Sequence, residues 1–330
     1  MLAACIIARN EQANLSRCLP SLAELVDEIV VLDTGSDDGS VDVAARWATS
    51  VVQGTWSDDF AQARNDAKSL TDAEWILTID ADEVAVAGAS ASCLRGFLRA
   101  CASNVGAVSV VISNASGPDV AGLEHHREFK ILRRAAADFV GRVHEHPRNL
   151  EYMCTAELPE SVLTLRHHGY SDAELVMQKA ARNARLSAIM LAETPAEDVL
   201  ERSRVCLDLG RSLMAAGEPV AAYEALEQAR TFADRDSSIW AWATDMQARL
   251  ALLRELPQQC LIFADELQHQ TGLRAYCDWL RCRAFVQLGH IPHAVLLLDA
   301  LVGEPVIDVG GHLLSETTFV QFRATLSASV

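Results

Sequence analysis

The sequence predicts an α/β domain built on a parallel sheet, followed by an all-α array of helical repeats. Its first half alternates short apolar runs with amphipathic helix patterns, the order expected of a parallel sheet with helical crossovers. Polar residues follow directly after these apolar runs, at the sheet edge where such sheets bind their ligands. Its second half is helical almost throughout, with turn signals 38 and 34 residues apart, close to the period of about 34 residues that is typical of helical hairpin repeats.

The composition limits the classes of protein to consider. The 330 residues allow two domains, and the 50% hydrophobic content is enough for a substantial core. The net charge of −17 argues against a nucleic-acid binder, because phosphate backbones require clustered Lys and Arg. The nine cysteines form no CxxC pair, so we expect neither a disulfide framework nor a zinc knuckle.

No transmembrane segment or signal peptide is expected. Nowhere do about 18 apolar residues run together, the length that a membrane-spanning helix requires. The apolar run Leu2–Ala8 is short, no basic stretch precedes it, and polar residues follow it at once. We therefore expect a cytoplasmic protein.

Four strands and three intervening helices are predicted at the start of the chain. Each strand is a continuous apolar run, as expected of strands buried on both faces of a sheet. The predicted strands are Leu2–Ala8, Glu28–Asp33, Ser50–Gln53 and Trp75–Ile79. The predicted helices are Asn14–Val26, Ser40–Trp47 with Ser40 as its N-cap, and Ser57–Leu70.

The middle of the chain has a mixed pattern, which we interpret as the acceptor-facing half of the first domain. Its strand-like runs are Ala107–Ser113, Phe129–Leu132 and Val162–Arg166, and a helix is predicted over Asp172–Leu191. Turns at residues 217, 255 and 289, which are 38 and 34 residues apart, indicate tetratricopeptide-like hairpins. We therefore predict a first domain over residues 1–192, repeats over 193–302 and a tail over 303–330.

A pair of aspartates is the sharpest local feature. Asp80-Ala81-Asp82 follows a buried strand, and two carboxylates placed in this way can hold one divalent cation. Such a cation neutralises a diphosphate and makes it a better leaving group. The same pattern occurs at residues 234–236 within the repeats, where we interpret it as a loop. The metal site is therefore predicted at Asp80 and Asp82 because this pair, unlike the second one, directly follows a strand.

Two further polar residues have alternative interpretations. Asp33 precedes a Gly-Ser loop and either caps that loop or binds the N3–H and ribose of a uridine. Arg64 is either a solvated helix residue or, beside Trp56 and Phe60, fixed towards the pocket.

The second half of the first domain adds two candidate positions. Arg142–His146 is either a polar surface loop or the source of a general base, Glu145. His167 and His168 follow a strand, and one of their imidazoles is a candidate to complete the metal site beside the aspartate pair. The alternative for both histidines is a structural role.

Taken in order, these segments resemble the family 2 glycosyltransferases of the GT-A fold. The set also resembles the branch with C-terminal tetratricopeptide-like repeats, which includes sublancin-type peptide S-glycosyltransferases and some flagellin glycosyltransferases. Lipopolysaccharide-core glucosyltransferases share the first four blocks. The blocks are Ile6–Glu11, Val26–Asp38, Trp56–Asn65, Trp75–Glu83, Val143–Glu145 and His167–Tyr170 with Lys179 and Arg182-Asn183.

The resemblance implies a role for each matched residue. The residues that line the nucleotide-sugar pocket are Ala8, Arg9, Glu11, Asp33, Arg64, Asp80, Ala81 and Asp82. Asp82 is the more direct ligand to Mn²⁺ or Mg²⁺, assisted by Asp80, with His167 as third ligand and His168 as the fallback. Glu145 is the catalytic base.

The function implied is inverting transfer of a hexose from a UDP-sugar, with UDP-glucose favoured and UDP-N-acetylglucosamine open. The acceptor is a Ser, Thr or Cys side chain of a protein or peptide held by the repeats. An alternative acceptor is lipopolysaccharide core or another glycan. An alternative of a different class is a repeat adaptor with a vestigial glycosyltransferase domain. Helical repeats also make a homodimer possible.

Overall fold

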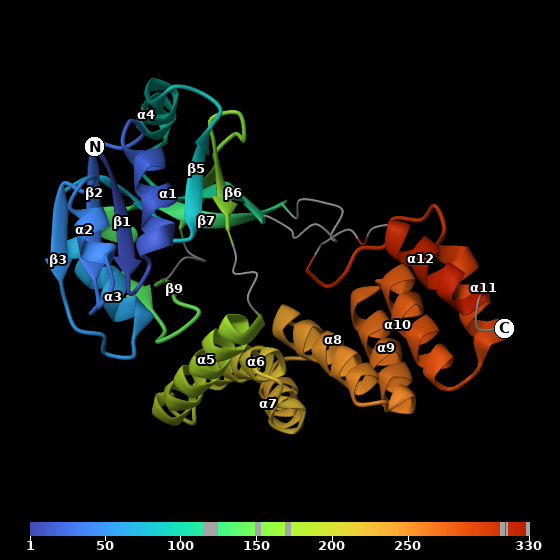
Figure 1. The fold of residues 1–330 in the computed structure, drawn as a ribbon. Helices are drawn as coiled ribbons and strands as arrows, with labels where there is room; N and C mark the ends of the chain where they lie inside the picture. The colour runs from blue at the N-terminus through green and yellow to red at the C-terminus, as the bar shows by residue number, and fades with distance from the viewer. Residues whose placement is uncertain (115–124, 149–152, 169–172, 311–313, 315, 328–330) are drawn as a thin grey trace. The chain divides into compact units, whose positions relative to one another are not determined.

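The computed structural model describes residues 1–114, 125–148, 153–168, 173–310, 314 and 316–327. The chain divides into two compact units, Met1–Ser171 and Asp172–Val330, which Figure 1 shows as a sheet-containing part and a helical part. The boundary differs from the one predicted at residue 192. Helix α5 (Ala173–Glu193) belongs to the helical unit because it packs against α6 (Val199–Ala215).

A mixed nine-stranded sheet forms the centre of the first unit (Figure 1). The strand order is β3-β2-β1-β4-β7-β6-β11-β5, with β10 also paired to β6. Its first four strands are mutually parallel, whereas β7 runs antiparallel to β4 and β6. The bounds are β1 (Leu2–Ala8), β2 (Glu28–Asp33), β3 (Ser50–Gln53), β4 (Trp75–Thr78), β5 (Glu83–Ala87), β6 (Val105–Asn114), β7 (His125–Arg133), β10 (Cys154–Glu157) and β11 (Leu163–His167).

Helices cover both faces of this sheet. Neighbouring residues of β1 belong to different core clusters: Ile6 belongs to the one that includes residues of α1, α2 and α4, and Cys5 to the one that includes residues of α3. This two-sided burial explains why β1 and β2 read as continuous apolar runs. The bounds are α1 (Gln12–Leu22), α2 (Ser40–Ala44), α3 (Phe60–Ser69) and α4 (Ala91–Ala100), with a 3₁₀ turn at Arg134–Ala136 and a separate pair of short strands, β8 (Phe139–Val140) and β9 (His146–Pro147).

The structure confirms the first three predicted strands residue for residue. It ends the fourth strand at Thr78 and the three helices at Leu22, Ala44 and Ser69, each earlier than predicted, and it corrects two further details. Ser40 is not an N-cap: α2 follows Gly39, and the Ser40 hydroxyl accepts a hydrogen bond from the Glu11 N–H at 2.8 Å. Strand β5 was not predicted. It begins directly after the aspartate pair and runs antiparallel to β11, with Glu83 opposite His167.

Three helical hairpins form most of the second unit. Their turns contain Gly217, Glu255 and Gly289, with φ angles of 80°, 55° and 75°, which confirms the predicted turn positions. Small residues recur at equivalent buried positions in the three hairpins, namely Gly210, Ala248 and Cys282. The hairpins pair α6 with α7 (Pro219–Phe232), α8 (Ser238–Leu253) with α9 (Pro257–Thr271), and α10 (Arg274–Gln287) with α11 (Ile291–Leu301).

The C-terminal tail, for which the sequence carried no signal, contains a helix that closes this core. Helix α12 (Glu316–Ser327) places Phe319 and Phe322 edge-on against the Trp279 ring, at centroid distances of 5.1 and 5.0 Å. Phe319 is only 2% exposed. Among the helices described, none is long and apolar enough to cross a membrane.

Candidate active site

Two loops at the carboxyl ends of β1 and β2 are joined by hydrogen bonds. The Asn10 N–H donates to the Ser36 hydroxyl at 2.8 Å, and the Asn10 side-chain oxygen accepts from the Asp37 N–H at 2.9 Å. Asn10 has a φ of 57°, a conformation that Asn tolerates better than most residues. The paired loops leave Arg9 exposed beside the buried end of β1 at Ala8.

Asp33 caps its own loop. Its carboxylate accepts from the backbone N–H of Gly35 at 3.1 Å and of Ser36 at 2.9 Å, and also from the Ser36 hydroxyl. The side chain is buried, with the residue 2% exposed. The turn-capping interpretation is therefore confirmed, and contact with a uridine stays a prediction.

Arg64 joins two carboxylates that are distant in sequence. Its Nη2 donates to Asp80 Oδ1 at 2.8 Å, and its Nε donates to Glu145 Oε1 at 2.5 Å. The guanidinium lies over the Phe139 ring at 5.9 Å and is 12% exposed. Arg64 is therefore fixed, as one of its two interpretations predicted, but by Phe139 and the carboxylates, while Trp56 packs against Phe60.

The segment that carries Glu145 is held against helix α3. The Asn65 side chain donates to the Phe139 carbonyl at 3.0 Å and accepts from the Phe139 N–H at 2.9 Å. The Phe60 N–H donates to the Arg142 carbonyl at 2.9 Å. The Glu145 side chain is consequently only 12% exposed, so a freely solvated surface loop does not describe it.

A buried lysine beneath the aspartate pair was missed by sequence analysis. Lys130 Nζ lies 3.2 Å from Asp80 Oδ2, 2.9 Å from Glu83 Oε1 and 3.3 Å from Glu128 Oε2, and its side chain is 9% exposed. It is one of only three lysines, and it interrupts an apolar strand run, which is the signal that marks it. Charged side chains are rarely buried without a partner.

The charges of this cluster shift its protonation equilibria. Burial and the Asp80 carboxylate raise the pKa of Glu83 to about 7. Burial also opposes ionisation of Asp80, but the Lys130 and Arg64 cations outweigh it and hold the pKa of Asp80 well below its usual range. In the same way, burial opposes the Lys130 ammonium, while its carboxylate neighbours raise its pKa. The two cations therefore favour the ionised form of Asp80.

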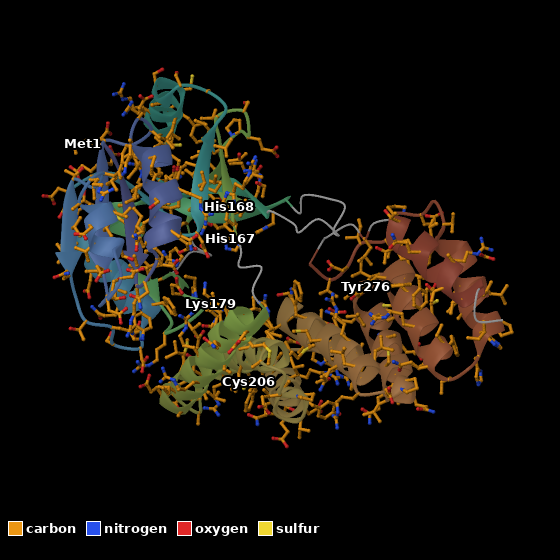
Figure 2. The ribbon with its side chains drawn as sticks, viewed as in Figure 1. Met1, His167, His168, Lys179, Cys206 and Tyr276 are labelled. Atoms are coloured by element: carbon orange, nitrogen blue, oxygen red, sulfur yellow. The ribbon has the colours of Figure 1, made fainter. Side chains whose placement is uncertain are left out.

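Asp82 meets a histidine across the sheet. His167 Nε2 lies 3.4 Å from Asp82 Oδ2, and the His168 N–H donates to the Asp82 carbonyl at 2.8 Å. The nearby Asp82 carboxylate raises the pKa of His167 above its ordinary value, against the opposing effect of burial. Figure 2 shows both histidines at one edge of the first unit. Gly169 and Tyr170, which follow them, lie outside the described residues.

The Asp82–His167 pair fits a divalent cation better than Asp80 does. Metal bonds of about 2.0–2.3 Å place neighbouring ligand atoms about 3 Å apart, close to the observed 3.4 Å. Both oxygens of Asp80 instead accept from Arg64 and Lys130. Within the described parts of the chain, no three His, Cys, Asp or Glu side chains gather around a metal position. The structure thus assembles two of the three predicted ligands.

Comparison with known proteins relates the first domain to glycosyltransferases. Residues 3–148 match the model of glycosyl transferase family 2. A TPR repeat-containing protein of Synechococcus elongatus is 29% identical over 231 residues, which cover 68% of this chain and 55% of that protein. The SPbeta prophage-derived glycosyltransferase SunS of Bacillus subtilis is 30% identical over 199 residues, 58% of this chain and 45% of SunS.

The chain therefore matches about half the length of these relatives. The crystal structure of S. aureus TarS 1-349 in complex with UDP-GlcNAc covers 82% of this chain and 92% of its own at 14% identity, with a TM-score of 0.42. That similarity is too low to transfer a ligand. The family match lies within the sheet-containing unit, so residues 3–148 are similar to a family 2 glycosyltransferase domain, and helical hairpins of the tetratricopeptide-like kind follow it.

Proposed function

We propose that the chain is an inverting, metal-dependent glycosyltransferase that transfers a hexose from a UDP-sugar, with UDP-glucose the first candidate, to a protein or peptide side chain. One observation supports this most strongly. Arg64 joins Asp80 and Glu145 at the carboxyl end of β4, which is where a sheet of this kind binds its ligand. The relative named as a glycosyltransferase supports the same class of activity.

The donor occupies the edge formed by the ends of β1, β2 and β4. In this proposal Ala8, Arg9, Glu11 and Asp33 line the nucleoside side of the pocket, with Ala81 between the two aspartates. Arg64 Nη1 has no hydrogen-bond partner among the described residues, so it can donate to the diphosphate. A guanidinium already fixed by two carboxylates loses little conformational entropy when it binds.

Asp82 and His167 would hold Mn²⁺ or Mg²⁺, which would supply positive charge to stabilise the diphosphate leaving group. Asp80 has a positioning role next to this pair, because its carboxylate forms ion pairs with Arg64 and Lys130. His168 holds the Asp82 backbone through its N–H, which keeps the strand end in place. Asp80 as a direct metal ligand remains a prediction.

Glu145 is the proposed general base. It takes the proton from an acceptor hydroxyl or thiol as that O or S forms a bond to C1 of the sugar. The bond from C1 to the β-phosphate oxygen breaks on the opposite face, and its electron pair leaves with UDP. Arg64, paired with Glu145, stabilises the negative charge that develops on the phosphate oxygen.

The acceptor side of the proposal rests on the repeats. Successive helical hairpins present an extended surface suited to an extended polypeptide. We therefore assign the acceptor as a Ser or Thr hydroxyl or a Cys thiol of a protein.

The test is a transfer assay with UDP-glucose, Mn²⁺ and pooled peptides that contain Ser, Thr or Cys, analysed by mass spectrometry. We expect peptides to gain the mass of one hexose with the wild-type chain and to gain none with Asp82→Ala. Asp234→Ala, in the second aspartate pair, is the matched control and should retain activity. Transfer to a lipopolysaccharide core but to no peptide would move the acceptor to a glycan. Turnover unchanged in Asp82→Ala would rule out the proposed site.

A further inference from the structure

The repeat register places arginines at equivalent positions of the three hairpins. Arg211, Arg249 and Arg283 each lie six residues before the turn residue of their hairpin. Thirteen residues before the turn, the equivalent residues of the second and third hairpins are aromatic, namely Trp242 and Tyr276. The alignment follows from the turn positions that the structure confirms.

In the structure, each of the first two arginines reaches the aromatic ring of the next hairpin. The Arg211 guanidinium of α6 lies 5.9 Å from the Trp242 ring of α8. The Arg249 guanidinium of α8 lies 5.8 Å from the Tyr276 ring of α10, the residue labelled in Figure 2. We call these two arrangements the Arg211 step and the Arg249 step. They share the placement of an arginine over a ring one hairpin further on, and in the Arg249 step Arg249 Nε also donates to the Tyr276 hydroxyl at 3.0 Å.

The chain itself occupies the Arg249 step with an acidic segment. Asp308, in the segment between α11 and α12, brings its Oδ2 to 3.5 Å from Arg249 Nη2. The Asp308 side chain is 12% exposed, and its other oxygen accepts from the Gly310 N–H at 2.8 Å. Two residues earlier Val306 is fully buried in the core of this unit. An irregular segment is thus held by one carboxylate and one aliphatic anchor.

An acidic neighbour on its own helix does not prevent an arginine from binding this segment. Arg249 also pairs with Asp245 of α8 at 2.9 Å, yet it still holds Asp308. Arg211 has a similar neighbour, since Asp208 lies three residues before it on its own helix at a distance of 3.6 Å. The Arg211 side chain is 51% exposed, and no described residue outside α6 forms an ion pair with it.

We propose that the Arg211 step binds a carboxylate of an extended, acidic polypeptide segment, as the Arg249 step binds Asp308. Both steps combine an arginine, an acidic neighbour on its own helix and an aromatic ring of the next hairpin, so a carboxylate is the expected ligand of both. By analogy with Val306 and Asp308, the segment carries an aliphatic residue two positions before its Asp or Glu. The site belongs to the helical unit, and it does not depend on the proposed transfer reaction.

The test uses the chain's own segment as the probe. A fluorescein-labelled peptide with the sequence of residues 303–310 is titrated with the full chain, and binding is followed by fluorescence anisotropy at low salt. We expect Arg211→Ala to raise the dissociation constant at least tenfold. The same peptide carrying Asp308→Asn should bind the wild-type chain as weakly, and both changes together should add little to either alone.

The matched control is Arg254→Ala. Arg254 also lies over an aromatic ring, that of Tyr223 at 5.8 Å, but it is not part of either step. This control should keep the dissociation constant within twofold of the wild-type value. Because Arg211 is half exposed, its substitution should leave the melting temperature unchanged, which circular dichroism verifies. The proposal is overturned if Arg211→Ala binds the peptide as the wild type does. It is also overturned if no binding to the wild type is seen up to about 1 mM of the chain, a dissociation constant that corresponds to roughly −4 kcal/mol.

Discussion

Replacing Lys130 by methionine removes the cation that neutralises the buried centre of the site. The Lys130 ammonium lies 2.9 Å from Glu83, whose side chain is 4% exposed, and also contacts Asp80 and Glu128. Removing one partner of a buried ion pair costs about 3–5 kcal/mol, because the other charge stays unpaired. For a unit of this size, that loss lowers the melting temperature by about 6–20 °C.

The size of this loss should depend on pH. Because the pKa of folded Glu83 is about 7, well above its unfolded value, its contribution to stability is largest at low pH and falls as the pH rises through 7. Without Lys130, the pKa of Glu83 rises further, so the penalty for ionising it extends to higher pH. We therefore expect Lys130→Met to lose more stability at pH 8.5 than at pH 6.

Differential scanning calorimetry at these two pH values measures the effect on the first unit. A second substitution, Glu83→Gln, removes the unpaired charge and should recover more than half of the lost stability. The explanation is wrong if Lys130→Met melts within about 2 °C of the wild type at pH 8.5, a shift worth less than about 1 kcal/mol. It is equally wrong if the double variant is no more stable than Lys130→Met.

Three further predictions concern the catalytic groups. Glu145→Gln should lower turnover by about 10²–10⁴-fold with donor affinity nearly unchanged, as measured by kinetics and calorimetry, and retention of half the turnover would end its assignment as base. A metal competes with the proton for His167, whose pKa is raised, so Mn²⁺ affinity should rise between pH 6 and 8.5 when it is measured by titration calorimetry. An equal rise in the His167→Gln variant would exclude His167 as its cause. Asn65→Ala removes two hydrogen bonds to Phe139, and we expect it to lower the stability by about 1–3 kcal/mol and to lower kcat more than donor affinity. An unchanged kcat would show that Glu145 is positioned without Asn65.

The sequence was informative where function depends on strand ends. Buried parallel strands are continuous apolar runs, so the ends of β1 and β2 were located correctly, and the position of the aspartate pair after β4 followed from them. The contact between His167 and Asp82 was also anticipated, because both were expected at one site. The metal itself stays a prediction.

Contacts between distant segments were not predictable in the same way. Arg64 and Glu145 are 81 residues apart, and neither helix periodicity nor strand alternation places one beside the other. Lys130 was missed because strand patterns describe apolar residues, and its charge is compensated only in three dimensions. Helix α12 was missed because the residue it packs against, Trp279, lies in α10, about 40 residues earlier in the chain.

Nucleotide binding tests the central claim most directly. Isothermal titration of UDP into the wild-type chain, with and without Mn²⁺, requires no knowledge of the acceptor. We predict binding that strengthens in the presence of Mn²⁺, with this gain lost in Asp82→Ala and preserved in Asp234→Ala. Absence of UDP binding under both conditions, or an equal Mn²⁺ effect in Asp82→Ala, would contradict the assignment of this edge of the sheet as a metal-dependent donor site.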